Sequence, residues 1–167
     1  MFNKCSLLAF LLTAITANAV LPPSPGTYAI QNANSSLLLN LIGGMDPTQT
    51  IIEFPLTQPF VNNTNQLWTY IPGTGNTATL QLVKPSTFLS CNPPAIGTKC
   101  HASPSTPAPV WNVVPTGGGF LIVESVTGLT LTGLGASQQP VTLSVVNPIT
   151  NPEQVWVFID TSEAAGQ

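Results

Sequence analysis

Asn65-Gln66-Leu67-Trp68-Thr69 is the stretch that decides the fold, because its tryptophan recurs at a regular interval. Variants of this stretch are Pro109-Val110-Trp111 and Gln154-Val155-Trp156, and together they hold the three tryptophans of the chain. A large side chain that returns after about 44 residues is typical of one supersecondary unit used three times. The sequence therefore predicts a threefold repeat.

Short apolar and β-branched runs between turn residues fill the rest of the chain, and none longer than about ten residues has a helical period. Pro72–Asn76 and Pro115–Gly119 are expected turns that close two of the units. The twelve expected strands are residues 27–31, 37–41, 51–54, 66–71, 79–83, 88–91, 99–102, 110–114, 120–124, 129–131, 141–145 and 155–159. Four strands per unit, three units and no helix predict an all-β fold, a β-trefoil with pseudo-threefold symmetry, in which three hairpins cap a six-stranded barrel.

Alternation within the third unit supports half-buried strands. Leu131, Leu143 and Val145 are expected to face one way, and Thr130 and Ser144 the other. A single unit has no partner for its apolar face, so the three copies are expected to bury one common core.

The N-terminal residues have the parts of a secretory signal peptide. Lys4 supplies a positive charge, Leu7 to Ala14 is an apolar run, and Ala17-Asn18-Ala19 has small residues at the cleavage positions. The run is shorter than the roughly 20 residues of a spanning helix, and no later run is long enough. We expect a signal peptide over residues 1–19, secretion to the extracellular space and no membrane insertion. A single β-trefoil domain then covers residues 20–167, with repeats over about residues 26–75, 76–117 and 118–160.

Charge is scarce in this chain. Its 167 residues include three basic side chains, all lysines, and six acidic ones, and Lys4 leaves with the signal peptide. Phosphate binding needs clustered Lys or Arg, so we expect no nucleic-acid partner and no anionic membrane surface as a target. A surface kept soluble by Ser, Thr, Asn and Gln hydrogen-bonds with neutral polar ligands, sugars among them.

Cys91 and Cys100 are the cysteines that remain once Cys5 has left. An even pair in a secreted chain predicts a disulfide. The alternative, a metal site with His101, offers three ligands where zinc prefers four. We therefore expect no metal and no cofactor.

Two sequons predict N-glycosylation at Asn34 and Asn62. The first is Asn34-Ser35-Ser36 and the second is Asn62-Asn63-Thr64. The second lies close to the Asn65–Gln66 pair, where a glycan would crowd any site.

Three Gln-x-Trp elements in register, one of them degenerate, resemble the ricin-type (ricin B-like) β-trefoil lectins over essentially the whole mature chain. Each unit of that family also has a Leu-Asp-Val-like element. Its counterparts here are Leu39-Asn40-Leu41, Leu89-Ser90-Cys91 and Leu131-Thr132-Gly133. The resemblance implies that Trp68, Trp111 and Trp156 are core residues of the fold and do not contact sugar.

The resemblance also implies a sugar site built from a carboxylate, an aromatic ring and an Asn-Gln pair. A carboxylate accepts hydrogen bonds from sugar hydroxyls, and a ring stacks on the apolar face of a pyranose. The first unit has Asn40 at the carboxylate position, Phe54 as the ring and Asn65 with Gln66 as the pair. Asn40 departs from the pattern, because an amide has one acceptor oxygen, so recognition is weakened or redirected. Asp46 is a formal substitute that no spacing argument supports.

The other two units depart further from the family pattern. In the second unit the carboxylate, ring and pair positions hold Ser90, His101 and Ala108-Pro109. In the third unit they hold Thr132, Ser144 or Val145, and Glu153-Gln154. We expect at most one usable sugar site, in the first unit.

Three functions remain open from the sequence, with a secreted lectin that binds a neutral glycan or glycoprotein first. The second is a β-trefoil protease inhibitor, because the Pro-rich segments 92–95 and 103–109 are stiff enough to act as a wedge. The third is a protein-binding module with degenerate sugar sites. The Gln-x-Trp triplet favours the lectin, and the oligomeric state stays open.

We expect no enzymatic activity and assign no catalytic residue. The chain has one histidine, and its acidic residues are dispersed. A glycosidase needs two carboxyl groups across a sugar, for which Glu53 with Asp46 is only a formal pair. Sequence order leaves a Ser-His-Asp triad open, although no nucleophile-elbow motif supports one.

Overall fold

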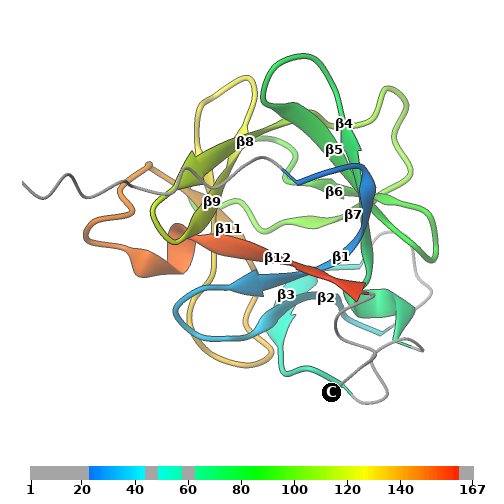
Figure 1. Ribbon diagram of the computed structural model, residues 1–167, viewed down its shortest axis with the longest axis horizontal. Coiled ribbons are helices and arrows are strands. Elements are labelled where there is room, and N and C mark those ends of the chain that lie inside the picture. Colours follow the sequence, from blue (N-terminus) through cyan, green and yellow to red (C-terminus); the bar gives the residue numbers. More distant parts are fainter. Residues whose placement is uncertain (1–22, 44–48, 58–62, 162–167) are drawn as a thin grey trace, which may run out of the picture.

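Twelve strands follow one another in the computed structural model, which describes residues 23–43, 49–57 and 63–161 (Figure 1). The strands are β1 Gly26–Asn32, β2 Leu38–Leu41, β3 Ile51–Phe54, β4 Trp68–Pro72, β5 Thr77–Leu82, β6 Phe88–Ser90, β7 His101–Ser103, β8 Trp111–Thr116, β9 Gly119–Glu124, β10 Thr130–Thr132, β11 Thr142–Ser144 and β12 Trp156–Asp160. Two 3-10 helices are η2 Thr64–Gln66 and η3 Pro152–Gln154. Each predicted strand overlaps an observed one. The first unit comprises β1–β4, the second β5–β8 and the third β9–β12.

Three sequence predictions lie outside the described residues. They are the signal peptide over residues 1–19, the formal acid Asp46 and the sequon residue Asn62. Within the described ranges, no helix is long and apolar enough to cross a membrane.

Six strands form a closed antiparallel barrel. β1 pairs with both β12 and β4, β4 with β5, β5 with β8, β8 with β9, and β9 with β12. Figure 1 shows β1 beside β12, so the first and last strands of the chain complete the ring. Closure leaves no exposed edge among these strands, which removes a template for aggregation.

Three hairpins, β2–β3, β6–β7 and β10–β11, cap the barrel. A cycle of backbone hydrogen bonds joins them: Ile51 N donates to Cys100 O (2.9 Å), Cys100 N to Val141 O (2.9 Å) and Val141 N to Ile51 O (3.0 Å). Each unit contributes one donor and one acceptor, so no unit can form this cycle alone. The all-β trefoil and its pseudo-threefold symmetry are thereby confirmed.

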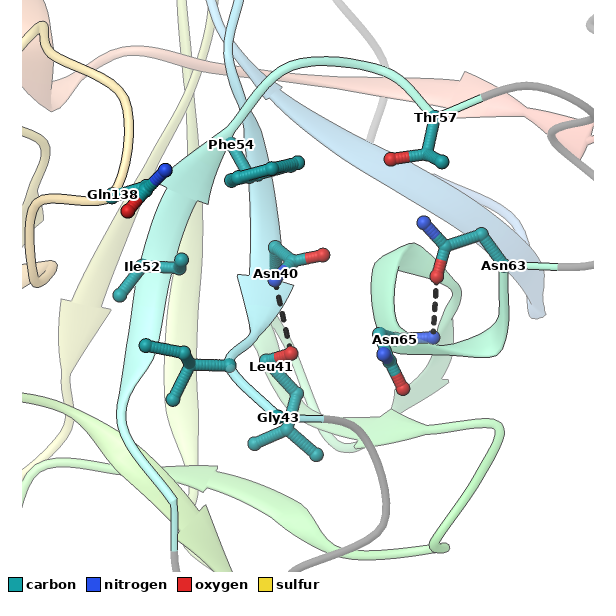
Figure 2. Close-up of a pocket in the computed structure, with 10 residues that line it drawn as sticks. Asn40, Leu41, Gly43, Ile52, Phe54, Thr57, Asn63, Asn65 and Gln138 are labelled. Carbon is teal, nitrogen blue, oxygen red and sulfur yellow. Dashed lines mark hydrogen bonds between the residues drawn. The ribbon is translucent and has the colours of Figure 1, made fainter.

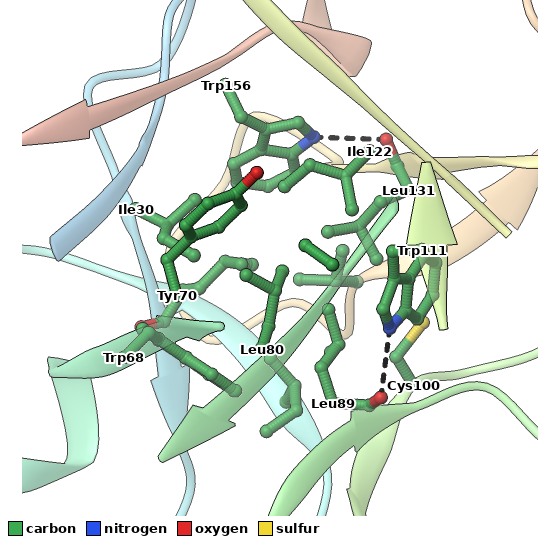
Figure 3. Packing of buried hydrophobic residues seen from close by; sticks show 14 of the residues in the cluster. Ile30, Trp68, Tyr70, Leu80, Leu89, Cys100, Trp111, Ile122, Leu131 and Trp156 are labelled. Atoms are coloured by element: carbon green, nitrogen blue, oxygen red, sulfur yellow. Dashed lines mark hydrogen bonds between the residues drawn. The ribbon is translucent and has the colours of Figure 1, made fainter. Parts of the chain in front are cut away.

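The three tryptophans occupy equivalent places in the core (Figure 3). Trp68, Trp111 and Trp156 are all buried, and each indole Nε1 donates a 3.1 Å hydrogen bond to a backbone carbonyl. The acceptors are the carbonyls of Leu39, Leu89 and Leu131. Each bond ties the last strand of a unit to the first strand of its hairpin, and a buried indole needs such a partner. The tryptophans are core residues, as the resemblance implied.

The predicted disulfide joins Cys91 to Cys100 across the second hairpin. It closes a short loop, for which the chain-entropy model gives a stabilisation on the order of 2–3 kcal/mol. Among the described residues, no group of three or more His, Cys, Asp or Glu side chains could hold a metal ion.

Two details of the predicted alternation are wrong. Thr130 is fully buried, and its Oγ1 donates to Ile122 O (3.2 Å), which satisfies the hydroxyl inside the fold. Val145 is 61% exposed, because β11 ends at Ser144 and the chain turns outward there.

Candidate functional site

The cycle of hydrogen bonds between the hairpins fixes which residues correspond among the three units. Ile51, Cys100 and Val141 are equivalent, so the position three residues later is Phe54 in the first unit. The same position is Ser103 in the second unit and Ser144 in the third. Likewise, the acceptors of the tryptophan bonds place Asn40, Ser90 and Thr132 at one position.

This correspondence corrects the ring expected in the second unit. His101 pairs with Ser90 across its hairpin, as Ile52 pairs with Asn40 in the first unit. His101 therefore occupies the place of Ile52, and Ser103 occupies the place of Phe54. The connections within the hairpins differ in length, so counting along the sequence does not give this register.

A pocket of about 520 Å³ lies in the first unit (Figure 2). It brings together three of the predicted residues, Asn40, Phe54 and Asn65, which come from β2, β3 and η2. The lining also includes Leu41, Ile42, Gly43, Ile52, Thr57, Asn63 and Gln138. A concave, mostly apolar surface with a few convergent polar groups is the usual form of a small-ligand site.

Asn40 lies at the bottom of this pocket and is 8% exposed. Its Nδ2 donates to Leu41 O (2.9 Å), which fixes the orientation of the amide. Oδ1 consequently points into the pocket, on the side of Asn63 and Asn65 (Figure 2). Asn40 stands where the resemblance implies a carboxylate, and its amide still offers an acceptor oxygen to a ligand.

Phe54 provides the apolar side of the pocket. It is the last residue of β3, is half-buried, and pairs with Leu38 on β2. In Figure 2 its ring lies above Asn40, next to the space where Asn40 Oδ1 points. The ring can thus cover the C–H face of a sugar whose hydroxyls reach Asn40.

Gln66 is not a contact residue, which corrects the expectation for the Asn-Gln pair. Its side chain is 0% exposed. Its Oε1 accepts from Thr57 N and Asn63 Nδ2 (both 3.1 Å), and its Nε2 donates to Pro55 O (2.8 Å). Because the amide is fully buried and both its nitrogen and its oxygen bond within the protein, it does not reach a ligand. Gln66 instead holds the segment after β3 against η2.

Asn63 and Asn65 form the polar side of the pocket. Asn63 caps η2, since its Oδ1 accepts from Asn65 N (3.3 Å). The Asn65 side chain is half-buried and makes no hydrogen bond to the described residues, so its amide is available to a ligand. Asn63, Thr57 and Gln138 were not predicted as lining residues. An Asn directly before a short helical turn is a capping signal that would have indicated Asn63.

The pocket is electrically neutral in its described lining. None of its residues is charged or titrates near neutral pH. Lys84 and Lys99, the two lysines in the described part of the chain, lie outside the lining. Its recognition chemistry is therefore amide hydrogen bonding and apolar contact.

The corresponding place in the second unit is a hollow of about 550 Å³ that differs in chemistry. It has Ser90, His101 and Ser103 on the hairpin, and the Pro-rich segment 105–110 forms another wall. Pro109 replaces Gln66, so the anchoring amide is missing. Ala108 replaces Asn65 and brings no polar group.

In the third unit the polar groups at this place bond to one another. Thr132 Oγ1 lies 2.7 Å from Ser144 Oγ, and Gln154 Nε2 donates to Ser144 Oγ (2.7 Å). Gln154 Oε1 accepts from Asn147 N (2.7 Å), so Gln154 is an anchor like Gln66. Glu153 stands where the first unit has Asn65, and it accepts a hydrogen bond from Asn34 Nδ2.

Asn34 is exposed in the turn between β1 and β2. Its Nδ2, the atom that N-glycosylation would modify, is the donor to Glu153 Oε1. Glycosylation of Asn34 remains a prediction, and it would have to replace this hydrogen bond.

Solved structures resemble this chain over most of its length. The Rhizoctonia solani agglutinin is 26% identical with a TM-score of 0.72, over 85% of this chain and 99% of that one. A ricin B-like lectin from Macrolepiota procera, solved in complex with lactose, is 24% identical with a TM-score of 0.70, over 84% and 99%. A designed threefold-symmetric protein, ThreeFoil, is 15% identical with a TM-score of 0.71, over 81% and 99%.

No family model matches the sequence, and no curated protein matches it. The likeness to these solved structures is one of fold. The chain has the fold of the ricin B-like β-trefoil lectins, as its three Gln-x-Trp elements predicted.

Proposed function

We propose that this protein is a secreted lectin that binds a neutral glycan in the first-unit pocket. The observation that carries the proposal is the convergence of Asn40, Phe54 and Asn65 on one pocket. These residues come from three separate segments, and their free groups face the same space (Figure 2). No corresponding set exists at the described positions of the other two units.

The proposed recognition combines stacking with amide hydrogen bonds. Phe54 covers the apolar face of a sugar ring, Asn40 Oδ1 accepts from a hydroxyl, and the Asn65 amide both donates and accepts. Neutral hydrogen bonds are about half as strong as those to a carboxylate, so the missing acid lowers affinity. With a few bonds of about 1 kcal/mol each, we expect dissociation constants nearer millimolar than nanomolar.

The neutral lining supports a neutral ligand. A sialylated or sulfated glycan brings a negative charge, and no described lining residue offers a cation to pair with it. The same lining supports a binding role over hydrolysis, since none of its described residues has a titratable side chain for acid–base chemistry.

A glycan array that includes lactose, other neutral glycans and their sialylated forms tests the proposal. We expect the wild-type protein to bind neutral glycans, and Asn65→Ala to bind them at least about tenfold more weakly, because it loses two or more hydrogen bonds. The melting temperature of this variant should match the wild type, since its side chain makes no hydrogen bond to the described residues.

Asn151→Ala is a matched control, because Asn151 precedes η3 of the third unit and makes no side-chain capping bond. It should bind as the wild type does. A wild-type protein that binds no glycan, or an Asn65→Ala variant that binds normally, would contradict the proposed site. Inhibition of a protease panel without glycan binding would favour the trefoil inhibitor instead.

A further inference from the structure

One wall of the first-unit pocket comes from the third unit. Gln138 lies in the connection between β10 and β11, and it lines the pocket beside Ile52 and Phe54 (Figure 2). Asn65 lies on the opposite side of Asn40 in the same view. The pocket is therefore a junction between two units, and its two polar ends belong to different parts of the chain.

The backbone at Gln138 has a conformation that side chains disfavour. Its φ is +66°, in the left-handed region. The corresponding residue of the second unit, three positions before the hydrogen-bond cycle, is Gly97, with a φ of +81°. Both amides donate to the next hairpin: Gly97 N to Leu143 O (2.8 Å) and Gln138 N to Glu53 O (2.7 Å). The second and third units thus have the same backbone conformation at this position, with glycine in the second and glutamine in the third.

The connection that carries Gln138 is pinned to the strand that carries Phe54. Glu53 is 0% exposed, and its Oε2 accepts from Leu134 N (2.7 Å) and Gly135 N (2.8 Å). Glu53 N also donates to Gln139 O (3.0 Å). These bonds hold both ends of the segment, so the Gln138 side chain is kept at the pocket despite the disfavoured backbone.

We propose that Gln138 is a specificity-determining residue that contacts the second ring of a neutral oligosaccharide bound in the first unit. This inference rests on the proposed function. A first ring between Phe54 and Asn65 leaves the Gln138 end of the pocket for a second ring. The Gln138 amide has a donor and an acceptor for hydroxyls there. A side chain in this backbone conformation costs free energy, and the bonds between Glu53 and the segment 134–139 hold it there.

Titration calorimetry with lactose, N-acetyllactosamine, cellobiose, chitobiose and their monosaccharides tests the proposal. The wild-type protein should bind at least one disaccharide about fivefold more tightly than its monosaccharide, which corresponds to about 1 kcal/mol. Gln138→Gly should remove this difference and leave monosaccharide affinity unchanged. Its melting temperature should stay equal or rise, because glycine adopts a positive φ freely.

Ser137→Ala is the control, since Ser137 lies on the same segment and does not line the pocket. It should retain the disaccharide preference. A Gln138→Gly variant with an unchanged preference, or with equal loss for both sugars, would overturn the role of Gln138 while Asn65→Ala still defines the site. A wild-type protein that binds none of these sugars would overturn the proposed function and this inference together.

Discussion

The first and third units share the same strands and buried glutamine, but their other polar side chains have different partners. Gln66 and Gln154 are both buried, and each joins the segment after its hairpin to a 3-10 turn. In the first unit the remaining polar atoms of Asn40 and Asn65 face a pocket. In the third unit the hydroxyls of Thr132 and Ser144 bond to each other and to Gln154. The two units thus differ in whether these polar groups face a pocket or bond within the protein, with no change of fold.

The first and third units also differ at the position of the aromatic ring. Phe54 presents an aromatic face in the first unit, where the third unit has the small Ser144. The hydroxyl of Ser144 is within reach of Gln154 because no ring intervenes. One substitution at this position therefore removes the stacking surface and supplies a partner for the anchor.

The largest expected effect tests whether the tryptophans of the two units contribute equally to the free energy of unfolding. Trp68→Ala and Trp156→Ala should each lower the free energy of unfolding by about 3–5 kcal/mol, because each empties a buried site and orphans a carbonyl. Urea unfolding of both variants measures this. A difference of several kcal/mol between them would show that the units do not contribute equally, despite their identical 3.1 Å indole bonds.

A smaller expected effect distinguishes the contribution of the buried glutamines to stability from their contribution to glycan binding. Gln66→Ala and Gln154→Ala should each lose about 1–3 kcal/mol of stability, because each removes a buried side chain together with its hydrogen bonds to partly buried groups. Only Gln66→Ala should also weaken glycan binding, since it releases the segment that borders the pocket. Thermal unfolding and the glycan array measure the two effects separately. Equal loss of binding in both variants would place a second functional site in the third unit.

The smallest effect concerns Glu53, whose counterpart in the third unit is the buried Leu143. Burial raises the pKa of Glu53, and repulsion from Glu153 adds to this, against hydrogen bonds that lower it. A raised pKa means that the folded state binds the proton more tightly than the unfolded state does. The associated stability is therefore full below the ordinary value of 4.5 and is lost as pH rises through the raised pKa.

Glu53→Gln should remove this pH dependence. Between pH 4.5 and neutral pH, the wild-type protein should lose stability relative to the variant. Urea unfolding at a series of pH values gives the difference. Glu124→Gln is an informative control, because the hydrogen bonds to Glu124 from Thr127 and Val126 outweigh its burial and lower its pKa. The corresponding difference for Glu124 should have the opposite sign, with wild-type stability lost as pH falls.

The fold could be predicted from sequence because its determinants are local or periodic. Trp68, Trp111 and Trp156 mark the repeat, and apolar runs between turns mark the strands. The candidate site could be predicted in part: Asn40, Phe54 and Asn65, which line one pocket, each lie next to a repeat element. Gln66 was misassigned because its burial depends on the segment 55–57, which only the folded structure brings against it.

Other site residues depend on contacts between units that no local pattern records. The ring position of the second unit is Ser103 and not His101, because the hairpin connections differ in length. Gln138 is remote in sequence from the first unit, and its place follows from the bonds between Glu53 and the segment 134–139. A long-range contact of this kind has no sequence signal within a single chain.

The cycle of hydrogen bonds through Ile51, Cys100 and Val141 bears on which substitutions this fold tolerates. The cycle uses only backbone atoms, so the identity of the surrounding side chains is free to vary as long as the chain path is kept. The residues proposed for recognition, Asn40, Phe54, Asn65 and Gln138, are not members of this cycle. Natural or engineered substitutions in one unit can therefore change its ligand chemistry without altering the fold of the other two units.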